Sequence, residues 1–256
     1  MPSRSTPHSL LAANAAALFA TLIATPTWAA STCQAQSGAT PPTVVELYTS
    51  EGCSSCPPAD RWLSSLNNQP DVLPLAFHVN YWDRLGWQDR FATRATTERQ
   101  HRVREVLKGR YVYTPQVVLN GRDERQWSGY AAGRLAQVAG ATPSAPPTLT
   151  LQRTGHEVTA TVGTAQGQPA LAGYWAVVQD GLSSRVTRGE NAGETLQHDH
   201  VVSLYQPVAS WAADQPKTVQ LNLPQGPEFD ALRVAFVVTL PDLVHPVQAL
   251  SLHCPG

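Results

Sequence analysis

Hydrophobic and polar residues follow two different patterns along this chain. Up to about residue 140, short apolar runs rich in β-branched residues alternate with longer segments whose apolar positions recur at helical spacing. The runs predict buried strands of a largely parallel sheet, and the segments between them predict helices, so this half is expected to be an α/β layered arrangement. The predicted elements, in order, are a strand at 43–50, a helix at 57–68, a strand at 71–83, a surface helix at 89–107, a strand at 114–123 and a short helix at 130–139.

The last of these strands ends in Asn120-Gly121, a pair that favours a tight hairpin turn and predicts pairing with residues 124–130. After a Pro-rich joint at 140–147 the pattern becomes strictly alternating, with short runs separated by turn residues and no convincing helix. This alternating pattern predicts an antiparallel β-sandwich. The expected organisation is an N-terminal segment at 31–42, an α/β domain at 43–142 and a β-sandwich at 146–256.

The first thirty residues have the features of a secretory signal peptide. Arg4 precedes an apolar run that closes with small residues, and cleavage after Ala29 or Ala30 fits the small-residue rule. A retained membrane anchor is the weaker interpretation, because Asn14 and Pro26 interrupt the run. We therefore expect a secreted or periplasmic protein, in a compartment where disulfides persist.

Composition excludes some partners. The 256 residues contain 18 basic and 19 acidic side chains, a net charge of −1, so there is no electrostatic reason to expect binding to nucleic acid or to an anionic membrane. No cofactor is expected.

Four cysteines allow three pairings. The pairing that we favour joins Cys53 to Cys56 and leaves Cys33 to pair with Cys254, which would tie the two ends of the mature chain together. The alternative is two unpaired thiols near the chain ends.

The C-x-x-C spacing of Cys53 and Cys56 has three interpretations: a metal site, a structural disulfide or a redox pair. Structural zinc needs two further soft ligands close by, and the other cysteines lie at the far ends of the chain. Cys53 stands between a predicted strand and a predicted helix, where unpaired amides and the helix dipole stabilise a thiolate. We therefore predict that Cys53 is the nucleophile and that Cys56 is the resolving thiol.

A second signal lies about sixty residues downstream, where Thr114 and Pro115 open a strand. With the cysteine pair as context we expect a cis Thr114–Pro115 bond that presents the backbone of Thr114 to an extended substrate, although an ordinary trans proline at a strand start is the alternative.

Together these runs resemble a known family. VVELYTSEGCSSCPPAD, HVNYWDRLGWQDRFA, YTPQVVLNG and RGENAGETLQHDHVV are similar to a domain-of-unknown-function family of secreted proteins (domain of unknown function 1223), and the first half resembles the thioredoxin-like superfamily. The resemblance implies a thioredoxin-like α/β fold at 43–142, with Cys53 as nucleophile, Cys56 as resolving cysteine and Pro115 as cis-proline, followed by the all-β sandwich domain. The narrower family implies no established activity.

The chain departs from these patterns at three positions. Asn80 stands where the family usually has Asp. Glu46, the candidate for the buried acid of thioredoxins, lies seven residues before Cys53, one more than the usual offset, and one residue changes the face of a strand. Gly52 replaces the aromatic residue that precedes the first cysteine of reductants.

Other polar and aromatic residues cluster at the end of the second predicted strand. Tyr81 and Trp82, with Thr114, are candidate substrate-binding residues, since ligands bind at the carboxyl edge of α/β sheets. His78 is a candidate third metal ligand beside Cys53 and Cys56, but packing against the backbone is the favoured interpretation. His198 and His200 are interpreted as surface residues, and the segment 189–194 as a loop.

The prediction is an exported thiol–disulfide oxidoreductase that acts on protein thiols or disulfides through Cys53 and Cys56. The alternative is a binding or copper-delivery protein in which the cysteine pair is structural or captures a metal.

Overall fold

The computed structural model describes residue 1 and residues 32–67, 69–130, 135, 145–224 and 232–254. The contacts along the chain separate residues 1–30 from a second compact unit, residues 31–256. The predicted signal peptide at 1–30 and most of the predicted helix at 130–139 lie outside the described residues. None of the helices in the described ranges is long and apolar enough to cross a membrane.

An eight-stranded sheet forms the centre of this unit. Its strands, in spatial order, are β14 (Pro246–His253), β13 (Arg233–Thr239), β8 (Ala170–Gln179), β11 (Val201–Ala212), β3 (Val72–His78), β2 (Thr43–Thr49), β4 (Gln116–Leu119) and β5 (Arg122–Asp123). β2 and β3 pair in parallel, as their apolar runs predict, and β11 continues the sheet from β3, also in parallel. The other neighbours in this sheet are antiparallel.

The predicted fold class, a thioredoxin-like α/β fold followed by an all-β sandwich domain, is wrong. The protein is mostly β, and the described residues contain only two α-helices, α1 (Pro57–Ser64) and α2 (Arg94–Val106). Strands from both predicted halves share one sheet, and the backbone of Ala76 in β3 donates a hydrogen bond of 2.8 Å to the carbonyl of His200. The physical reason is that periodicity identifies a strand but not its partner, and β3 takes its second neighbour from the distant β11.

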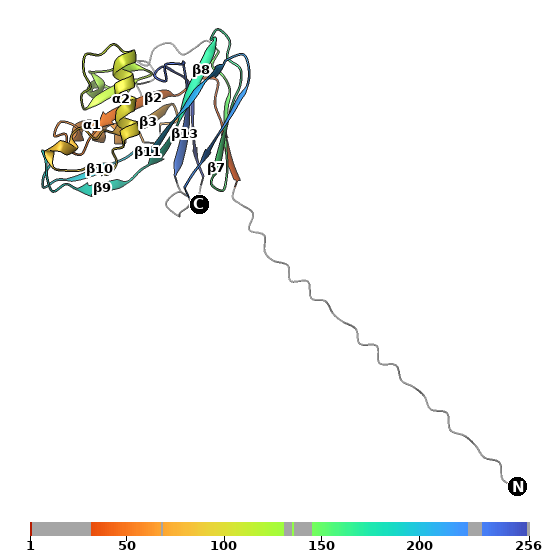
Figure 1. Ribbon diagram of the computed structural model, residues 1–256, viewed down its shortest axis with the longest axis horizontal. Helices are drawn as coiled ribbons and strands as arrows, with labels where there is room; N and C mark the ends of the chain where they lie inside the picture. The colour runs from red at the N-terminus through yellow and green to blue at the C-terminus, as the bar shows by residue number, and fades with distance from the viewer. Residues whose placement is uncertain (2–31, 68, 131–134, 136–144, 225–231, 255–256) are drawn as a thin grey trace. The chain divides into compact units, whose positions relative to one another are not determined.

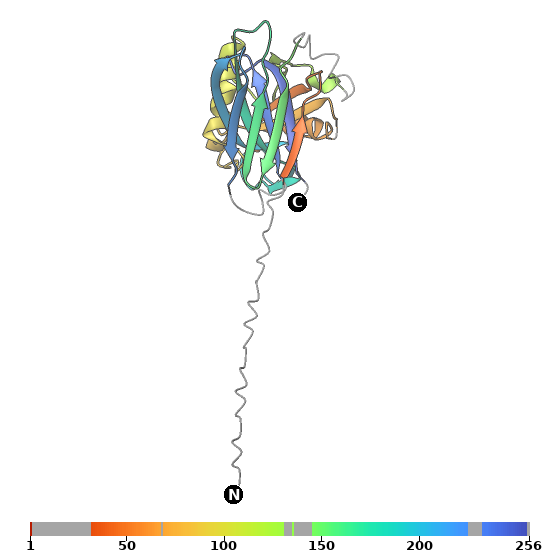
Figure 2. The same cartoon turned by 90° about the vertical axis from the view of Figure 1, so that its right-hand side faces the viewer.

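A second sheet of four strands packs on one face of the eight-stranded sheet (Figure 2). Its order is β1 (Thr32–Gln36), β6 (Leu149–Thr154), β7 (Glu157–Val162) and β12 (Lys217–Asn222). β6 and β7 form the predicted hairpin at 148–164, and their buried residues alternate along each strand. These side chains pack against Trp175 of β8 and Phe236 of β13, so the apolar face of each sheet is buried by the other.

The disulfide Cys33–Cys254 joins β1 to the end of β14, with a Cα–Cα distance of 5.9 Å. It therefore links the two sheets, and it confirms the pairing that leaves Cys53 for Cys56.

The two helices lie over the part of the large sheet that contains β2 and β3 (Figure 1). α1 begins at two prolines, as predicted, and buries Ala59 and Leu63 against β2 and β4. α2 begins at a capping box formed by Thr93 and Thr96, and its buried Val103 packs in the cluster on the other face.

Shorter elements complete the unit. The short strand β5 pairs with β4 across the Asn120-Gly121 turn, whose φ angles are 44° and 79°, so the predicted hairpin turn forms, but the second strand is Arg122–Asp123 and not the predicted 124–130. A separate two-stranded sheet of β9 (Leu182–Arg185) and β10 (Thr195–His198) extends beside α1 (Figure 1). The 3₁₀ turns are η1 (Asp83–Leu85) and η2 (Trp127–Gly129).

Candidate functional site

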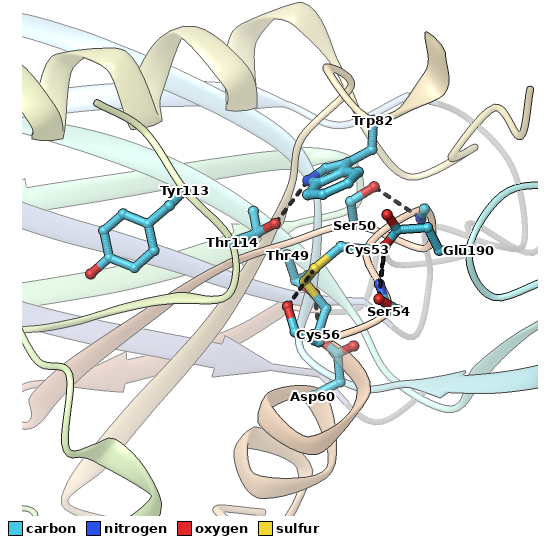
Figure 3. Close-up of a disulfide and its surroundings, with 12 residues drawn as sticks. Thr49, Ser50, Cys53, Ser54, Cys56, Asp60, Trp82, Tyr113, Thr114 and Glu190 are labelled. Atoms are coloured by element: carbon cyan, nitrogen blue, oxygen red, sulfur yellow. Dashed lines mark hydrogen bonds between the residues drawn. A yellow bond between two sulfur atoms is a disulfide. The ribbon is translucent and has the colours of Figure 1, made fainter. Parts of the chain in front are cut away.

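Cys53 and Cys56 lie in the connection between β2 and α1. After Thr49 the chain turns through two consecutive backbone hydrogen bonds, from Cys53 N to Ser50 O and from Cys56 N to Cys53 O, each 3.1 Å long. Cys56 is the N-cap residue of α1, and the two cysteines form a disulfide with a Cα–Cα distance of 5.4 Å (Figure 3). The pair therefore occupies the strand-to-helix junction that the sequence predicts.

The disulfide is covered. Both cysteines are 0% exposed, whereas Ser54 and Ser55 between them are exposed. The hydroxyl of Ser55 lies 3.4 Å from the Sγ of Cys53. A partner cannot touch either sulfur while the surrounding segments stay in this arrangement.

Trp82 forms one side of the cover. A Cβ atom at Gly52 would lie 2.9 Å from the Cβ of Trp82, a distance that only glycine permits. The indole Nε1 of Trp82 donates a hydrogen bond of 2.8 Å to Thr114 Oγ1, and Tyr81 lies next to it, with ring centroids 6.3 Å apart. The Thr114–Pro115 bond is cis, as expected. The structure thus places Trp82 and Thr114, two of the three predicted substrate-binding residues, beside the disulfide (Figure 3), and the third, Tyr81, lies next to Trp82.

The other side of the cover comes from the segment 189–194, between β9 and β10. The carboxylate of Glu190 accepts hydrogen bonds from the backbone N–H of Ser54 (3.0 Å) and from its hydroxyl (2.7 Å). The side-chain amide of Asn191 donates to the carbonyls of Glu51 (2.8 Å) and Cys53 (3.0 Å). We name residues 189–194 the covering loop.

The covering loop was correctly predicted to be a loop, but its place at the site was missed. The only signal for that place was the family resemblance of the run RGENAGETLQHDHVV, since 136 residues separate Glu190 from Ser54.

Beneath the disulfide lies a group of ionisable side chains that we name the acid–histidine cluster: Glu51, Asp60, His78, Asp89 and His198. His78 Nδ1 lies 2.7 Å from Asp89 Oδ2, and His198 Nε2 lies 3.1 Å from Glu51 Oε1. The two imidazole rings are 5.0 Å apart. Asp60 accepts a hydrogen bond of 2.7 Å from the hydroxyl of Thr49.

The environment of the cluster moves its pKa values in different directions. Burial raises the pKa of Asp60, and the positive potential of His78, the Thr49 hydroxyl and His198 only partly oppose it. Burial disfavours both ions of the His78–Asp89 pair, yet their mutual attraction raises the pKa of His78 and lowers that of Asp89. The cluster therefore combines a carboxyl whose pKa is raised, Asp60, with one whose pKa is lowered, Asp89.

Two expectations about single residues need correction. His198 and His200 are not surface residues: they are 3% and 2% exposed, and His200 lies 3.0 Å from Asp180. Their alternation suggested a strand with an open face, whereas β10 packs beside α1 and buries His198 in the cluster.

Glu46 points away from the cysteines. It lies on the α2 face of β2, where it pairs with Arg99 and accepts hydrogen bonds from Tyr48 (2.7 Å) and Tyr174 (2.6 Å). Thr49 lies on the opposite, α1 face and reaches the half-buried Asp60, so the acid near the cysteines comes from α1 and not from β2.

The geometry gives no support to a metal site. Within the described ranges, no group of three or more His, Cys, Asp or Glu side chains is arranged to hold a metal ion. The Nδ1 of His78, the candidate third ligand, lies against Asp89.

Comparison with known proteins identifies one family. The family model described as a protein of unknown function (DUF1223) matches residues 44–239. None of the curated proteins matches the chain.

Two solved structures are similar to the chain. The crystal structure of protein AGR_C_4864 from Agrobacterium tumefaciens is 29% identical, with a TM-score of 0.64 over 82% of this chain and 93% of that one. HBP35 of Porphyromonas gingivalis is 15% identical, with a TM-score of 0.54 over 83% of this chain and 75% of that one, which is a likeness of fold alone.

Proposed function

We propose that this chain, which belongs to the family of proteins of unknown function DUF1223, is an exported thiol–disulfide oxidoreductase that acts on protein thiols or disulfides. The observation that carries the proposal is the Cys53–Cys56 disulfide at the N-terminus of α1. The positive end of the helix dipole there favours a thiolate, which is the reactive form in exchange.

Cys53 is the sulfur that we assign to attack by the partner. The Ser55 hydroxyl, 3.4 Å from its Sγ, can donate a hydrogen bond to the Cys53 thiolate. A partner thiolate that attacks Cys53 forms a mixed disulfide and releases Cys56, and the reverse sequence oxidises a partner dithiol. Trp82 and Thr114 border the pair, and together with Tyr81, next to Trp82, they would form the surface on which a partner segment lies.

The buried state of the pair defines how exchange must begin. Because both sulfurs are 0% exposed, the covering loop or Trp82 has to move before a partner can reach them. The loop is held through the exposed Glu190 and through Asn191, so local opening is less costly than unfolding. Export, with the signal peptide at 1–30, would place the protein where partner disulfides persist.

The same burial favours a second candidate, a binding protein in which the Cys53–Cys56 bridge is structural. In that case the bridge would resist reduction in the folded protein, and any copper(I) bound by the reduced pair would depend on Cys53.

Equilibration of the folded protein with glutathione redox buffers, followed by acid quenching and alkylation, separates the two candidates. We expect reversible reduction of Cys53–Cys56, catalysis of insulin reduction or of dithiol oxidation, and loss of both in Cys53→Ser. The Cys33→Ser/Cys254→Ser variant is the matched control and should keep the activity.

A Cys56→Ala variant is expected to accumulate mixed disulfides with partner proteins through Cys53. A bridge that opens only when the protein unfolds would instead establish the structural candidate.

A further inference from the structure

A pocket rich in arginine lies next to Thr114. Its lining includes three arginines and two tyrosines, namely Arg104, Arg110, Arg125, Tyr111 and Tyr113. We name it the arginine–tyrosine pocket. Tyr113 directly precedes Thr114, and Figure 3 shows its ring directed away from the disulfide, on the other side of Thr114. The pocket therefore adjoins the surface that the proposed function assigns to a partner segment.

The size and rim of the pocket suit a protein partner. Its volume is about 160 Å³, whereas sites for small-molecule ligands and cofactors are typically about 300–1,000 Å³. It can thus hold one or two side chains. Tyr111 on its rim is 63% exposed, more than any other large apolar side chain in the described part of residues 32–254. Tyrosine and arginine are enriched where proteins bind each other.

The one acid in the lining already has partners within the pocket. The carboxylate of Asp123 accepts hydrogen bonds from the Tyr113 hydroxyl (2.7 Å) and from the Gln116 amide (2.9 Å), and Arg125 Nε lies 3.4 Å from it. The guanidinium carbon of Arg125 also lies 5.0 Å from the centroid of the Tyr113 ring. These contacts orient Arg125, yet its side chain is 68% exposed and can bind a second carboxylate.

Positive charge exceeds negative charge around the pocket. Arg104 pairs with Glu105 at 2.9 Å and lies in the last turn of α2, where the helix dipole favours a cation. Arg110 is exposed and makes no ion pair or hydrogen bond within the ranges that the structure describes. Residues 102–125 contain six basic and three acidic side chains, in a chain whose net charge is −1. Arg110 and Arg125 can therefore bind an acidic group from another molecule.

The spacing connects this charge to the cysteine site. Tyr111 and Tyr113 stand three residues and one residue before Thr114, and an extended chain advances about 3.3 Å per residue. A partner segment that passes Thr114 would bring a side chain to the pocket about two to four residues from its cysteine.

We propose that the arginine–tyrosine pocket binds an aspartate or glutamate side chain of the partner protein, so that exchange at Cys53 favours cysteines with acidic neighbours. This inference rests on the proposed redox function and names the class of its partner.

The test uses the oxidised protein and two unstructured dithiol peptides. The peptides differ only at the positions two to four residues before and after the cysteines, which are glutamate in one peptide and glutamine in the other. The two peptide thiols become a peptide disulfide, and their two electrons and two protons pass to the Cys53–Cys56 pair. Acid quenching and alkylation give the rate constant for each peptide, and the readout is the ratio of the glutamate to the glutamine constant.

Arg110→Gln/Arg125→Gln should lower this ratio about tenfold, because each of the two exposed ion pairs accounts for about threefold. Arg102→Gln removes an exposed arginine of α2 that does not line the pocket, and it should keep the wild-type ratio. The glutamates also change the pKa of the peptide thiols, but they do so equally for every protein variant, so the comparison isolates the pocket.

Salt gives a second measurement that needs no substitution. In the wild type the ratio should fall towards that of the double variant between about 0.05 M and about 0.5 M NaCl, because salt screens exposed ion pairs. The double variant should show a weaker dependence on salt.

The outcomes separate the two proposals. If both peptides reduce the bridge and the ratio is the same in wild type and in Arg110→Gln/Arg125→Gln, the role of the pocket is overturned and the redox function stands. If neither peptide reduces the bridge of the folded protein, the redox function is overturned and this inference with it.

Discussion

Arg99 has a charged side chain that is 2% exposed and lies in the middle of the α2 face of the large sheet. It pairs with Glu46 and lies against three aromatic rings, with its guanidinium carbon 4.1 Å from the centroid of Tyr174, 5.0 Å from that of Tyr205 and 5.2 Å from that of Phe77. It also donates to the Leu243 carbonyl at 3.1 Å. The ion pair is thus part of the core and takes no part in the cysteine site.

We expect Arg99→Met to lower the free energy of unfolding by about 3–5 kcal/mol, because it leaves Glu46 buried without its cation. The double variant Arg99→Met/Glu46→Gln should lower the free energy of unfolding by clearly less than the sum of the losses in Arg99→Met and in Glu46→Gln. Denaturant unfolding of the four proteins gives the coupling energy, with the exposed Arg102→Met as control. If the loss in the double variant equals the sum of the two single losses, Arg99 and Glu46 are not a coupled buried pair.

At the scale of elements, the covering loop is one of the two segments that cover the cysteines. Its two polar anchors contact the backbone of the 51–54 turn and the Ser54 hydroxyl and not the sulfurs, so the loop can open without breaking the disulfide. The hairpin of β9 and β10 carries the covering loop and also brings the imidazole of His198 to the acid–histidine cluster.

Asn191→Ala should increase the rate at which dithiothreitol reduces Cys53–Cys56 in the folded protein by about thirtyfold. It removes two hydrogen bonds that hold the loop closed, each contributing about 1 kcal/mol. Glu194→Ala, an exposed side chain in the same loop, is the control. Equal rates for wild type and Asn191→Ala would show that access is limited elsewhere, with Trp82 as the next segment to test.

At the scale of the whole molecule, the chain ends are joined by the Cys33–Cys254 disulfide across 221 positions. The bridge holds β1, the edge strand of the four-stranded sheet, against β14 at the edge of the large sheet. A closure of this length removes much of the conformational entropy of the unfolded chain.

The Cys33→Ser/Cys254→Ser variant should therefore lose about 2–5 kcal/mol of the free energy of unfolding, measured with the Cys53–Cys56 bridge intact. Its rate of exchange at Cys53 should stay unchanged, because neither terminal cysteine contacts the site. A loss of activity that exceeds the loss of folded protein would link the terminal bridge to the cysteine pair.

Local pattern was enough to determine several features of this protein. The apolar run 43–50, the prolines at 57 and 58 and the C-x-x-C spacing predicted a strand, a helix start and a disulfide between them, because each depends on residues a few positions apart. The Asn120-Gly121 turn and the β6–β7 hairpin were found for the same reason, whereas the cis Thr114–Pro115 bond was expected only with the cysteine pair as context.

Features that depend on partners far away in the sequence were decided by the tertiary structure. The apolar residues Val201 and Val202 predict a strand but do not show that β11 pairs with β3, and for this reason the predicted fold class was wrong. The positions of Glu46 and Asp60 in the sequence do not show which of the two carboxyls lies near the cysteines. The Gly-rich composition of the segment 189–194 predicts a loop but does not show that the loop covers the cysteines. Strand pairing, burial and the pKa values of buried groups arise from contacts between segments, and only packing of the whole chain sets those contacts.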